Sequence, residues 1–501
     1  MAFIKKNSHT HKTSGITSRW MDFGKPEAEG EKEELREYFE DFLNINDAFE
    51  KGKFIITGRK GAGKSAYVQY LLNNSGEENE LFCDVVTNEM IDLEKIIQSI
   101  PDDIVVNRDE TIYEWIILTR FVKLILLNKS GINAEGFSAL KKFEINNSGI
   151  ANVEKWMVIE EHKKSGMTVD FSDLIEKFPT AFSRETLKMK RRAPFYSLIP
   201  ALREIIRTML SYEVYSNINF ILVFDDLDVN FDLKNTQHKK RLISLLRITR
   251  KYNTQIFPNK NARVLNMLRD DIAMQLDGIS PDKNKMFSSY EYNLNWYNSD
   301  DGPEESSYLR RFINKRIRIC FDRLNIKYLK KDPWVSLVEN TPCFDYKDKT
   351  AFKYILDFTF YRPRDLVAFF NDIGEKKYNI PLQPQSIKTL LKNYLEWNIT
   401  EIKDELSNLY TENEIERIFN VFNRMAIPNS KITYQNVCDL FKEEDLDENV
   451  IEKMLEYNFI IPKDENNYQY FSYRERPRIN KNNDYYYSLP KCIYAYYTGT
   501  Y

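Results

Sequence analysis

A glycine-rich turn near the start of the chain constrains the fold more than any other feature of the sequence. Residues 54–72 read FIITGRKGAGKSAYVQYLL and contain the complete pattern GxxxxGKS, which runs from Gly58 to Ser65. The apolar residues before the pattern predict a strand over Lys53–Thr57, and the residues after it predict a helix from about Gly63 to Leu72. Glycines in such a turn let backbone N–H groups approach phosphate oxygens at the start of the helix, where the helix dipole favours an anion. We therefore predict a phosphate-binding loop.

The side chains of this loop have separate predicted roles. Lys64 is expected to reach the β- and γ-phosphates of a nucleotide, and the hydroxyl of Ser65 is expected to ligate Mg²⁺. A glycine-rich turn that binds nothing is the alternative, but it does not explain a lysine–serine pair at the start of a helix. The residues predicted to contact the nucleotide are Gly58, Lys60, Gly61, Ala62, Gly63, Lys64, Ser65 and Ala66.

A cluster of aspartates follows a second apolar run. The segment NINFILVFDDLD (217–228) predicts a buried strand over Asn219–Phe224 that ends at Asp225 and Asp226. We expect Asp225 to hold Mg²⁺ through water and Asp226 to activate the attacking water, with Asp228 as a second candidate for that role. The alternative is that these carboxylates cap a following helix, a role for which a single aspartate suffices.

Three arginines are further candidates for contact with phosphate. Arg269 ends a predicted strand over Arg263–Leu268, where it could sense the nucleotide or form a local ion pair with Asp270 or Asp271. Arg362 and Arg364 flank Pro363, a residue that favours the first turn of a helix. We predict that an arginine at this helix entrance reaches phosphate; the alternative for Arg364 is a pair with Asp365 or with the helix-entry region only.

The sequence favours ATP over GTP. A guanine-reading tetrad NKxD is missing, because Asn259-Lys260 and Asn284-Lys285 both lack the aspartate. The predicted cofactors are therefore ATP and Mg²⁺.

Composition excludes several other classes of protein. The 501 residues carry a net charge of −3 and only four histidines, and the five cysteines form no CxxC pair. These numbers argue against a disulfide scaffold, a zinc ribbon and a strongly basic nucleic-acid-binding surface. No apolar run is long enough to cross a membrane. We expect a soluble, cytoplasmic protein of roughly three domains.

Four segments carry a resemblance to a known family: MDFGKPEAEGE, FIITGRKGAGKSA, LRDDI and YRPRDL. In this order they resemble a bacterial P-loop ATPase family that is often found among phage-defence genes. That family looks like a branch of the AAA+/STAND ATPases, close to the origin-recognition type. The resemblance covers residues 21–400 and implies Walker A roles for Lys64 and Ser65 and Walker B roles for Asp225 and Asp226, although glutamate is usual at position 226. It further implies that Arg269 lies near a sensor-1 strand and that Arg362 or Arg364 lies near sensor 2.

The resemblance and the elements together predict the organisation of the chain. We expect an α/β fold in which a P-loop NTPase core with a parallel sheet spans residues 51–290 and carries a helical insertion at about 92–216. A leader and N-terminal helix would precede the core at 1–50. A helical lid would follow at 291–404, and a C-terminal winged-helix-like domain at 405–501, where three helices precede tyrosine-rich alternating segments.

The expected function is that of an ATP-hydrolysing switch or assembly platform. Since the sequence contains no nuclease, protease or deaminase signature, a separate effector protein is the expected partner, and phage defence is the expected setting. The resemblance implies a homo-oligomer with an arginine supplied between subunits, for which Arg316 and Arg250 are candidates. The alternatives are a DNA-remodelling ATPase, which could use the basic stretches 310–331 and 187–194, and a scaffold that binds ATP with negligible turnover.

Overall fold

The computed structural model describes most of the chain in two compact units. The described residues are 16–88, 107–147, 168–189, 191–227, 231, 235–257, 261–297, 303–339, 350–428, 430–466, 468–471, 473 and 485–500. We call Asn44–Arg59 together with Lys64–Leu294 the sheet unit. We call Met1–Leu43, Lys60–Gly63 and Asn295–Tyr501 the helical unit. The short segment 60–63 therefore belongs to the helical unit, although it lies between two segments of the sheet unit in sequence.

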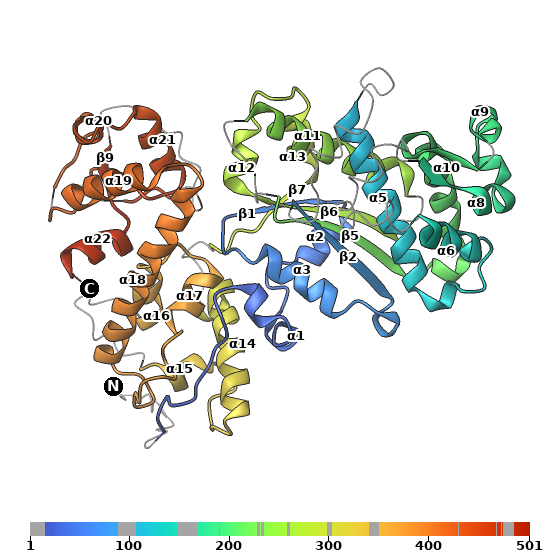
Figure 1. Cartoon of the computed structure of the whole chain (residues 1–501). Helices are drawn as coiled ribbons and strands as arrows, with labels where there is room; N and C mark the ends of the chain where they lie inside the picture. The colour runs from blue at the N-terminus through green and yellow to red at the C-terminus, as the bar shows by residue number, and fades with distance from the viewer. Residues whose placement is uncertain are drawn as a thin grey trace, which may run out of the picture. The chain divides into compact units, whose positions relative to one another are not determined.

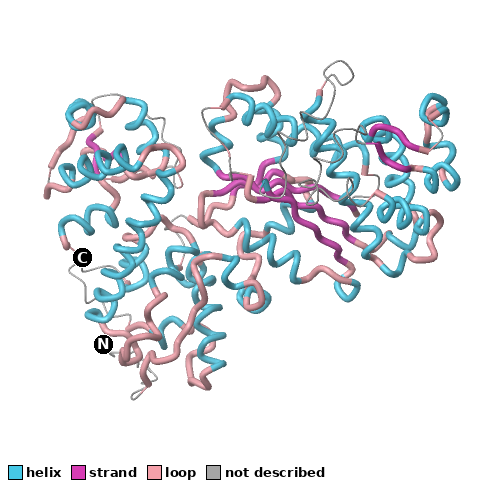
Figure 2. The backbone as a smooth tube through the Cα atoms, in the orientation of Figure 1, coloured by secondary structure: helices cyan, strands magenta, loops and turns pink. Residues whose placement is uncertain are grey.

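A five-stranded parallel sheet forms the centre of the sheet unit (Figures 1 and 2). Its order is β2-β5-β6-β1-β7, and every neighbouring pair is parallel. The strands are β1 (Ile55–Gly58), β2 (Leu81–Thr87), β5 (Asn219–Asp225), β6 (Ala262–Arg269) and β7 (Glu291–Asn293). The predicted α/β class with a parallel sheet is thus confirmed. Its central strands are nearly continuous apolar runs, as expected of strands covered on both faces.

Strand β7 was not predicted from the sequence. It has three residues, none of them fully buried, and so lacks the apolar run by which the other strands can be found. It pairs with β1 in the register Ile55 to Glu291 and Thr57 to Asn293.

Helices cover both faces of this sheet. Figure 1 shows α2 and α3 on one face and α11 and α13 on the other. The long helix α5 is buried along most of its length and packs against α10, α11 and the sheet. The bounds are α2 (Ile45–Glu50), α3 (Lys64–Asn73), α5 (Arg108–Leu127), α10 (Phe195–Leu210), α11 (Thr236–Lys251), α12 (Asp270–Gln275) and α13 (Lys283–Tyr290).

The segment between β2 and β5 is not made of helices alone. It contains α6 (Phe137–Asn146), α8 (Ser172–Lys177) and α9 (Arg184–Lys188) beside α5 and α10. It also contains an antiparallel pair, β3 (Thr168–Asp170) with β4 (Arg192–Pro194). The sequence predicted almost only helices here. The two strands were missed because three-residue strands leave no measurable period-two pattern.

The helical unit buries several of its arginines in ion pairs. On α14 (Tyr308–Arg323), Arg310 binds Asp332 at 2.9 Å and Arg316 binds Glu31 at 2.8 Å. The basic stretch 310–331 is therefore neither a fully solvated helix face nor an open basic surface, because its most buried arginines are neutralised by acids of the same unit. The other α-helices of the helical unit that begin before residue 405 are α1 (Leu35–Tyr38), α15 (Trp334–Leu337), α16 (Ala351–Leu356), α17 (Pro363–Phe369) and α18 (Pro384–Ser407).

The C-terminal module (residues 405–501) has three helices followed by a small antiparallel sheet. Its elements are α19 (Glu412–Met425), α20 (Tyr434–Glu443), α21 (Glu448–Glu456), β8 (Ile461–Lys463), β9 (Tyr486–Ser488) and α22 (Lys491–Thr498). The last helix returns to pack on α18 through the buried residues Cys492 and Ile493.

In the part of the chain that the structure describes, no helix is long and apolar enough to cross a membrane.

Candidate nucleotide-binding site

The glycine loop (residues 58–65) joins β1 to α3 and requires its glycines for conformational reasons. Gly61 has a φ of 80° and Gly63 a φ of 96°, which are values in the left-handed region where a side chain is disfavoured. A Cβ atom at Gly63 would have nothing within 4 Å, so there is open space beside this residue. The loop therefore combines an unusual backbone with room for a ligand where α3 begins.

Lys64 is the first residue of α3 and turns back onto its own loop. Its Nζ donates hydrogen bonds to the carbonyl oxygens of Gly58 at 2.8 Å and Arg59 at 3.2 Å. These are neutral acceptors that an anionic ligand could replace with a stronger charge-assisted bond. The ammonium group thus stays at the start of the helix, where a phosphate is favoured.

Three strand ends bring predicted residues to one edge of the sheet. Gly58 at the end of β1 is in register with Arg269 at the end of β6. Asp225 ends β5, the neighbour of β6, and is buried. Because the strands are parallel, their carboxyl ends lie at the same edge.

Asp226 follows directly and has a φ of 48°. A positive φ is uncommon for residues other than glycine but is several-fold enriched in aspartate, and it often marks a functional position. Asp228 lies outside the described residues.

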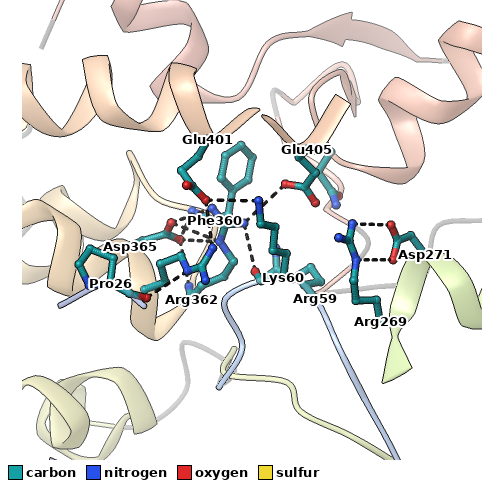
Figure 3. Close-up of polar contacts among 12 residues, drawn as sticks. Pro26, Arg59, Lys60, Arg269, Asp271, Phe360, Arg362, Asp365, Glu401 and Glu405 are labelled. Atoms are coloured by element: carbon teal, nitrogen blue, oxygen red, sulfur yellow. Dashed lines mark hydrogen bonds and ion pairs between the residues drawn. The ribbon is translucent and has the colours of Figure 1, made fainter. Parts of the chain in front are cut away.

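Arg269 is held in a local ion pair. Its Nε donates to Asp271 Oδ1 at 3.1 Å and its Nη2 to Asp271 Oδ2 at 2.7 Å (Figure 3). Of the two interpretations of Arg269, the structure therefore contains the ion pair. The two bonds use Nε and Nη2 of the guanidinium.

The neighbouring Asp270 lies in a polar network that sequence reasoning missed. Asn293 on β7 donates from Nδ2 to Asp270 Oδ1 and to Thr57 Oγ1, each at 3.0 Å. Burial raises the pKa of Asp270 above the ordinary aspartate value, although the positive charges of Lys64 and Arg59 act in the opposite direction. The segment LRDDI contains both aspartates. Because β7 was not predicted, the sequence gave no reason to assign different partners to Asp270 and Asp271.

In the helical unit, Arg362 contacts the glycine loop through a backbone oxygen. Its Nη1 donates to the carbonyl oxygen of Lys60 at 3.2 Å, while Nε and Nη2 bind the fully buried Asp365 (Figure 3). Burial alone would lower the pKa of Arg362, but the charge and hydrogen bonds of Asp365 and the charge of Glu405 act together against it and raise the pKa above the ordinary arginine value. The guanidinium is therefore firmly charged and held in place.

Arg364 lies against the tip of the same loop. A Cβ atom at Gly61 would come within 3.0 Å of Arg364 Cβ and 3.1 Å of its Cδ, so the close approach also requires glycine. Its Nη1 binds Glu401 at 3.0 Å and its Nε donates to the carbonyl oxygen of Pro26 at 3.2 Å. The partner of Arg364 is therefore Glu401 on α18 and not Asp365, the alternative considered from the sequence. Glu401 also pairs with Lys60 at 3.7 Å.

Trp296 is a second residue that sequence reasoning missed. Its Nε1 donates to the carbonyl oxygen of Ala62 at 2.8 Å. The ring packs against Phe42 and Phe312, with centroid distances of 6.2 Å and 5.7 Å. Nothing in the local sequence around residue 296 indicates this contact.

No preformed metal cluster accompanies these residues. In the described ranges, no group of three or more histidine, cysteine, aspartate or glutamate side chains could hold a metal ion. Mg²⁺ in phosphate sites commonly takes only one or two protein ligands and completes its shell with water and phosphate oxygens. Ser65 and Asp225 supply oxygen donors of the required kind.

A comparison with protein families gives a match for part of the helical unit. Residues 307–403 match a family described as the FunZ-associated C-terminal helical domain. The match begins just before α14, ends within α18 and includes Arg362 and Arg364, but does not reach the glycine loop. A comparison with curated proteins finds no match.

Proposed function

We propose that the chain is a P-loop ATPase of the AAA+/STAND type that works as a nucleotide-driven switch or assembly platform. The observation that carries the proposal is the shared sheet edge. The glycine loop with Lys64 follows β1, Asp225 ends β5, and the strand between them, β6, ends at Arg269. A phosphate-binding loop, a metal-holding acid and a residue near the γ-phosphate would all be needed at one edge of such a sheet.

The residues present fit ATP and Mg²⁺. The loop offers left-handed glycines and open space at Gly63, and Lys64 can exchange its carbonyl acceptors for phosphate oxygens. Ser65 and Asp225 would hold the metal, and Asp226 would orient the attacking water. When bound, Mg²⁺ and ATP would supply a γ-phosphoryl group polarised for attack by water.

The proposal extends to the other predicted parts of the protein. Residues 291–404 would form the lid, and the three helices and small sheet of residues 405–501 would form a winged-helix-like domain that contacts protein. A separate effector would provide the activity that the switch controls, and phage defence is the proposed setting. We propose that this protein acts in the cytoplasm as a homo-oligomer.

The structure gives less support to the alternative of a DNA-remodelling ATPase. The buried arginines of α14 already pair with Asp332 and Glu31, so this helix offers less free positive charge than its sequence suggests.

The decisive experiment removes the cation at the start of α3. Lys64→Ala should weaken ATP binding by at least about tenfold, because it deletes a charge-assisted contact with the phosphates. Lys53→Ala is the matched control, since the ammonium group of Lys53 donates to the carbonyl oxygen of Ser289 in an exposed hydrogen bond. Titration calorimetry with ATP and Mg²⁺ gives the affinity, and a phosphate-release assay gives the rate.

Two outcomes would contradict the proposal. Wild-type protein that binds no ATP would exclude a nucleotide-driven switch. Unchanged affinity in Lys64→Ala would show that any binding occurs elsewhere.

In the same assays Asp226→Asn should retain binding while losing turnover, and a normal rate would move the water-activating role to Asp228 or away from both.

A further inference from the structure

The tip of the glycine loop is held by hydrogen bonds to two of its own carbonyl oxygens. The carbonyl oxygen of Lys60 accepts from Arg362, and that of Ala62 accepts from Trp296. Both donors belong to the helical unit, as does the tip itself.

Each of these contacts determines the direction of a neighbouring amide. In a planar trans peptide, the C=O and N–H groups point to opposite sides. A donor that fixes the carbonyl of Lys60 therefore fixes the N–H of Gly61 on the opposite side. In the same way, the donor to Ala62 fixes the N–H of Gly63. These are the two glycines of the loop that have a positive φ, and glycine gives the backbone its greatest conformational freedom.

We infer that Arg362 and Trp296 are positioning residues, which orient the Gly61 and Gly63 amides toward phosphate without contacting phosphate themselves. This inference rests on the proposed function, because it assigns a purpose to the loop only if the loop binds a nucleotide. The sequence predicted that Arg362 reaches phosphate; under this inference Arg362 instead holds the carbonyl oxygen of Lys60.

The surroundings of both side chains suit a rigid support. Arg362 is locked by Asp365, with Glu405 at 4.0 Å and the ring of Phe360 5.1 Å from its guanidinium carbon. If Arg362 moved to follow a ligand, it would leave the buried carboxylate of Asp365 without its ion-pair partner, which is costly. Trp296 is buried, and the rings of Phe42 and Phe312 limit its rotation. Because these contacts already order the loop, less binding free energy is lost in ordering it when a ligand binds.

The test separates positioning from direct contact by comparing ATP with ADP. Loop amides cradle the α- and β-phosphates, which both nucleotides carry. Trp296→Phe removes one N–H donor and keeps an aromatic ring, so it should weaken ATP and ADP by the same factor, about three- to tenfold. The turnover rate at saturating ATP should stay close to the wild-type value.

A second variant tests the hydrogen bond to the carbonyl oxygen of Lys60. Arg362→Lys keeps a positive charge for Asp365 but has one nitrogen where the guanidinium has three, so it cannot serve Asp365 and Lys60 together. The same equal loss for ATP and ADP is expected. Trp397→Phe on α18 is the matched control, because Trp397 packs on Tyr394 at 5.8 Å and has no described contact with the loop.

The outcomes distinguish this inference from the proposed function. If wild-type protein binds neither nucleotide, the proposed function fails and the inference fails with it. If wild-type protein binds but both variants bind equally well, the inference alone is wrong. A loss confined to ATP would also overturn it, because that pattern indicates direct contact with the γ-phosphate. Melting temperatures without nucleotide, compared with the Trp397→Phe control, verify that each variant is folded.

Discussion

Asp270 shows how the charge state of one residue can affect stability and, under the proposed function, the affinity for nucleotide. Burial raises the pKa of its carboxyl group relative to the unfolded chain. Between the unfolded and folded pKa values, the folded protein therefore binds the proton more readily than the unfolded protein does. Stability falls as the pH rises through this range, and the cost remains at all higher pH. The ionised form of Asp270 therefore opposes folding.

Asp270→Asn should raise the melting temperature at pH 7. The amide removes the charge and keeps an oxygen that can accept from Asn293. The gain should shrink as the pH is lowered, because the wild-type carboxyl becomes protonated and loses its penalty. ATP should also bind more tightly, since a negative charge near the phosphates is gone. Calorimetric melting across pH and ATP titration measure both effects.

Asp277→Asn is the control for this prediction. Asp277 is largely exposed and pairs with Lys283, so its replacement should give no gain at pH 7. A stabilisation by Asp270→Asn that is the same at pH 4 and pH 7 would show that charge is not its cause.

At the scale of elements, the charges on α21 bear on what the C-terminal module would contact. As the third helix of the module, it would be the one to enter the major groove if the module read DNA. Asp447 at its cap and Glu448 and Glu452 within it are exposed, while Lys453 pairs with Glu456. Acidic side chains facing a polyanion are repelled, which favours a protein partner.

We therefore expect the full chain to bind duplex DNA only weakly. At physiological salt its dissociation constant should be no tighter than about 1 µM, the strong end of nonspecific binding. The charge reversals Glu448→Arg and Glu452→Arg should raise this affinity only if α21 faces DNA, so unchanged affinity is expected. Fluorescence anisotropy at low and physiological salt measures both. Submicromolar, sequence-dependent binding that survives physiological salt would contradict this and favour the DNA-remodelling alternative.

For the whole molecule, the structure narrows the choice of an arginine that could act between subunits. Arg316 is only 4% exposed and binds Glu31 and the carbonyl oxygen of Phe23, so it is not placed to reach another subunit. The side chain of Arg250 is 33% exposed and its described ion pair with Asp282 is long, at 3.9 Å. Of the two candidates, Arg250 is therefore the better one.

Arg250→Ala should lower the turnover rate by about 1,000-fold or more while leaving ATP affinity intact, as expected when an arginine completes the site of a neighbouring subunit. Light scattering with a non-hydrolysable ATP analogue should show an oligomer of the wild-type protein. Arg207→Ala, which changes an exposed arginine on α10, is the control. A strict monomer with full ATPase activity would rule out the shared site.

The sequence by itself determined the parts of this protein that depend on neighbours in the chain. The apolar runs gave the main strands to within two residues at each end, because burial on both faces requires such runs. The glycines and Lys64 of the loop were recognisable because the backbone conformation and the start of a helix are local properties. Strand β7 was missed because three partly exposed residues carry no comparable pattern.

Only the tertiary structure decided which polar groups meet. The hydrogen bond from Arg362 to Lys60 joins residues 302 positions apart, and that from Trp296 to Ala62 joins residues 234 apart. The sequence likewise left Arg269 with two possible acids, and folding selected Asp271. A side chain hydrogen-bonds to whatever partner packing brings within about 3 Å, and that partner is set by the arrangement of distant elements rather than by local pattern.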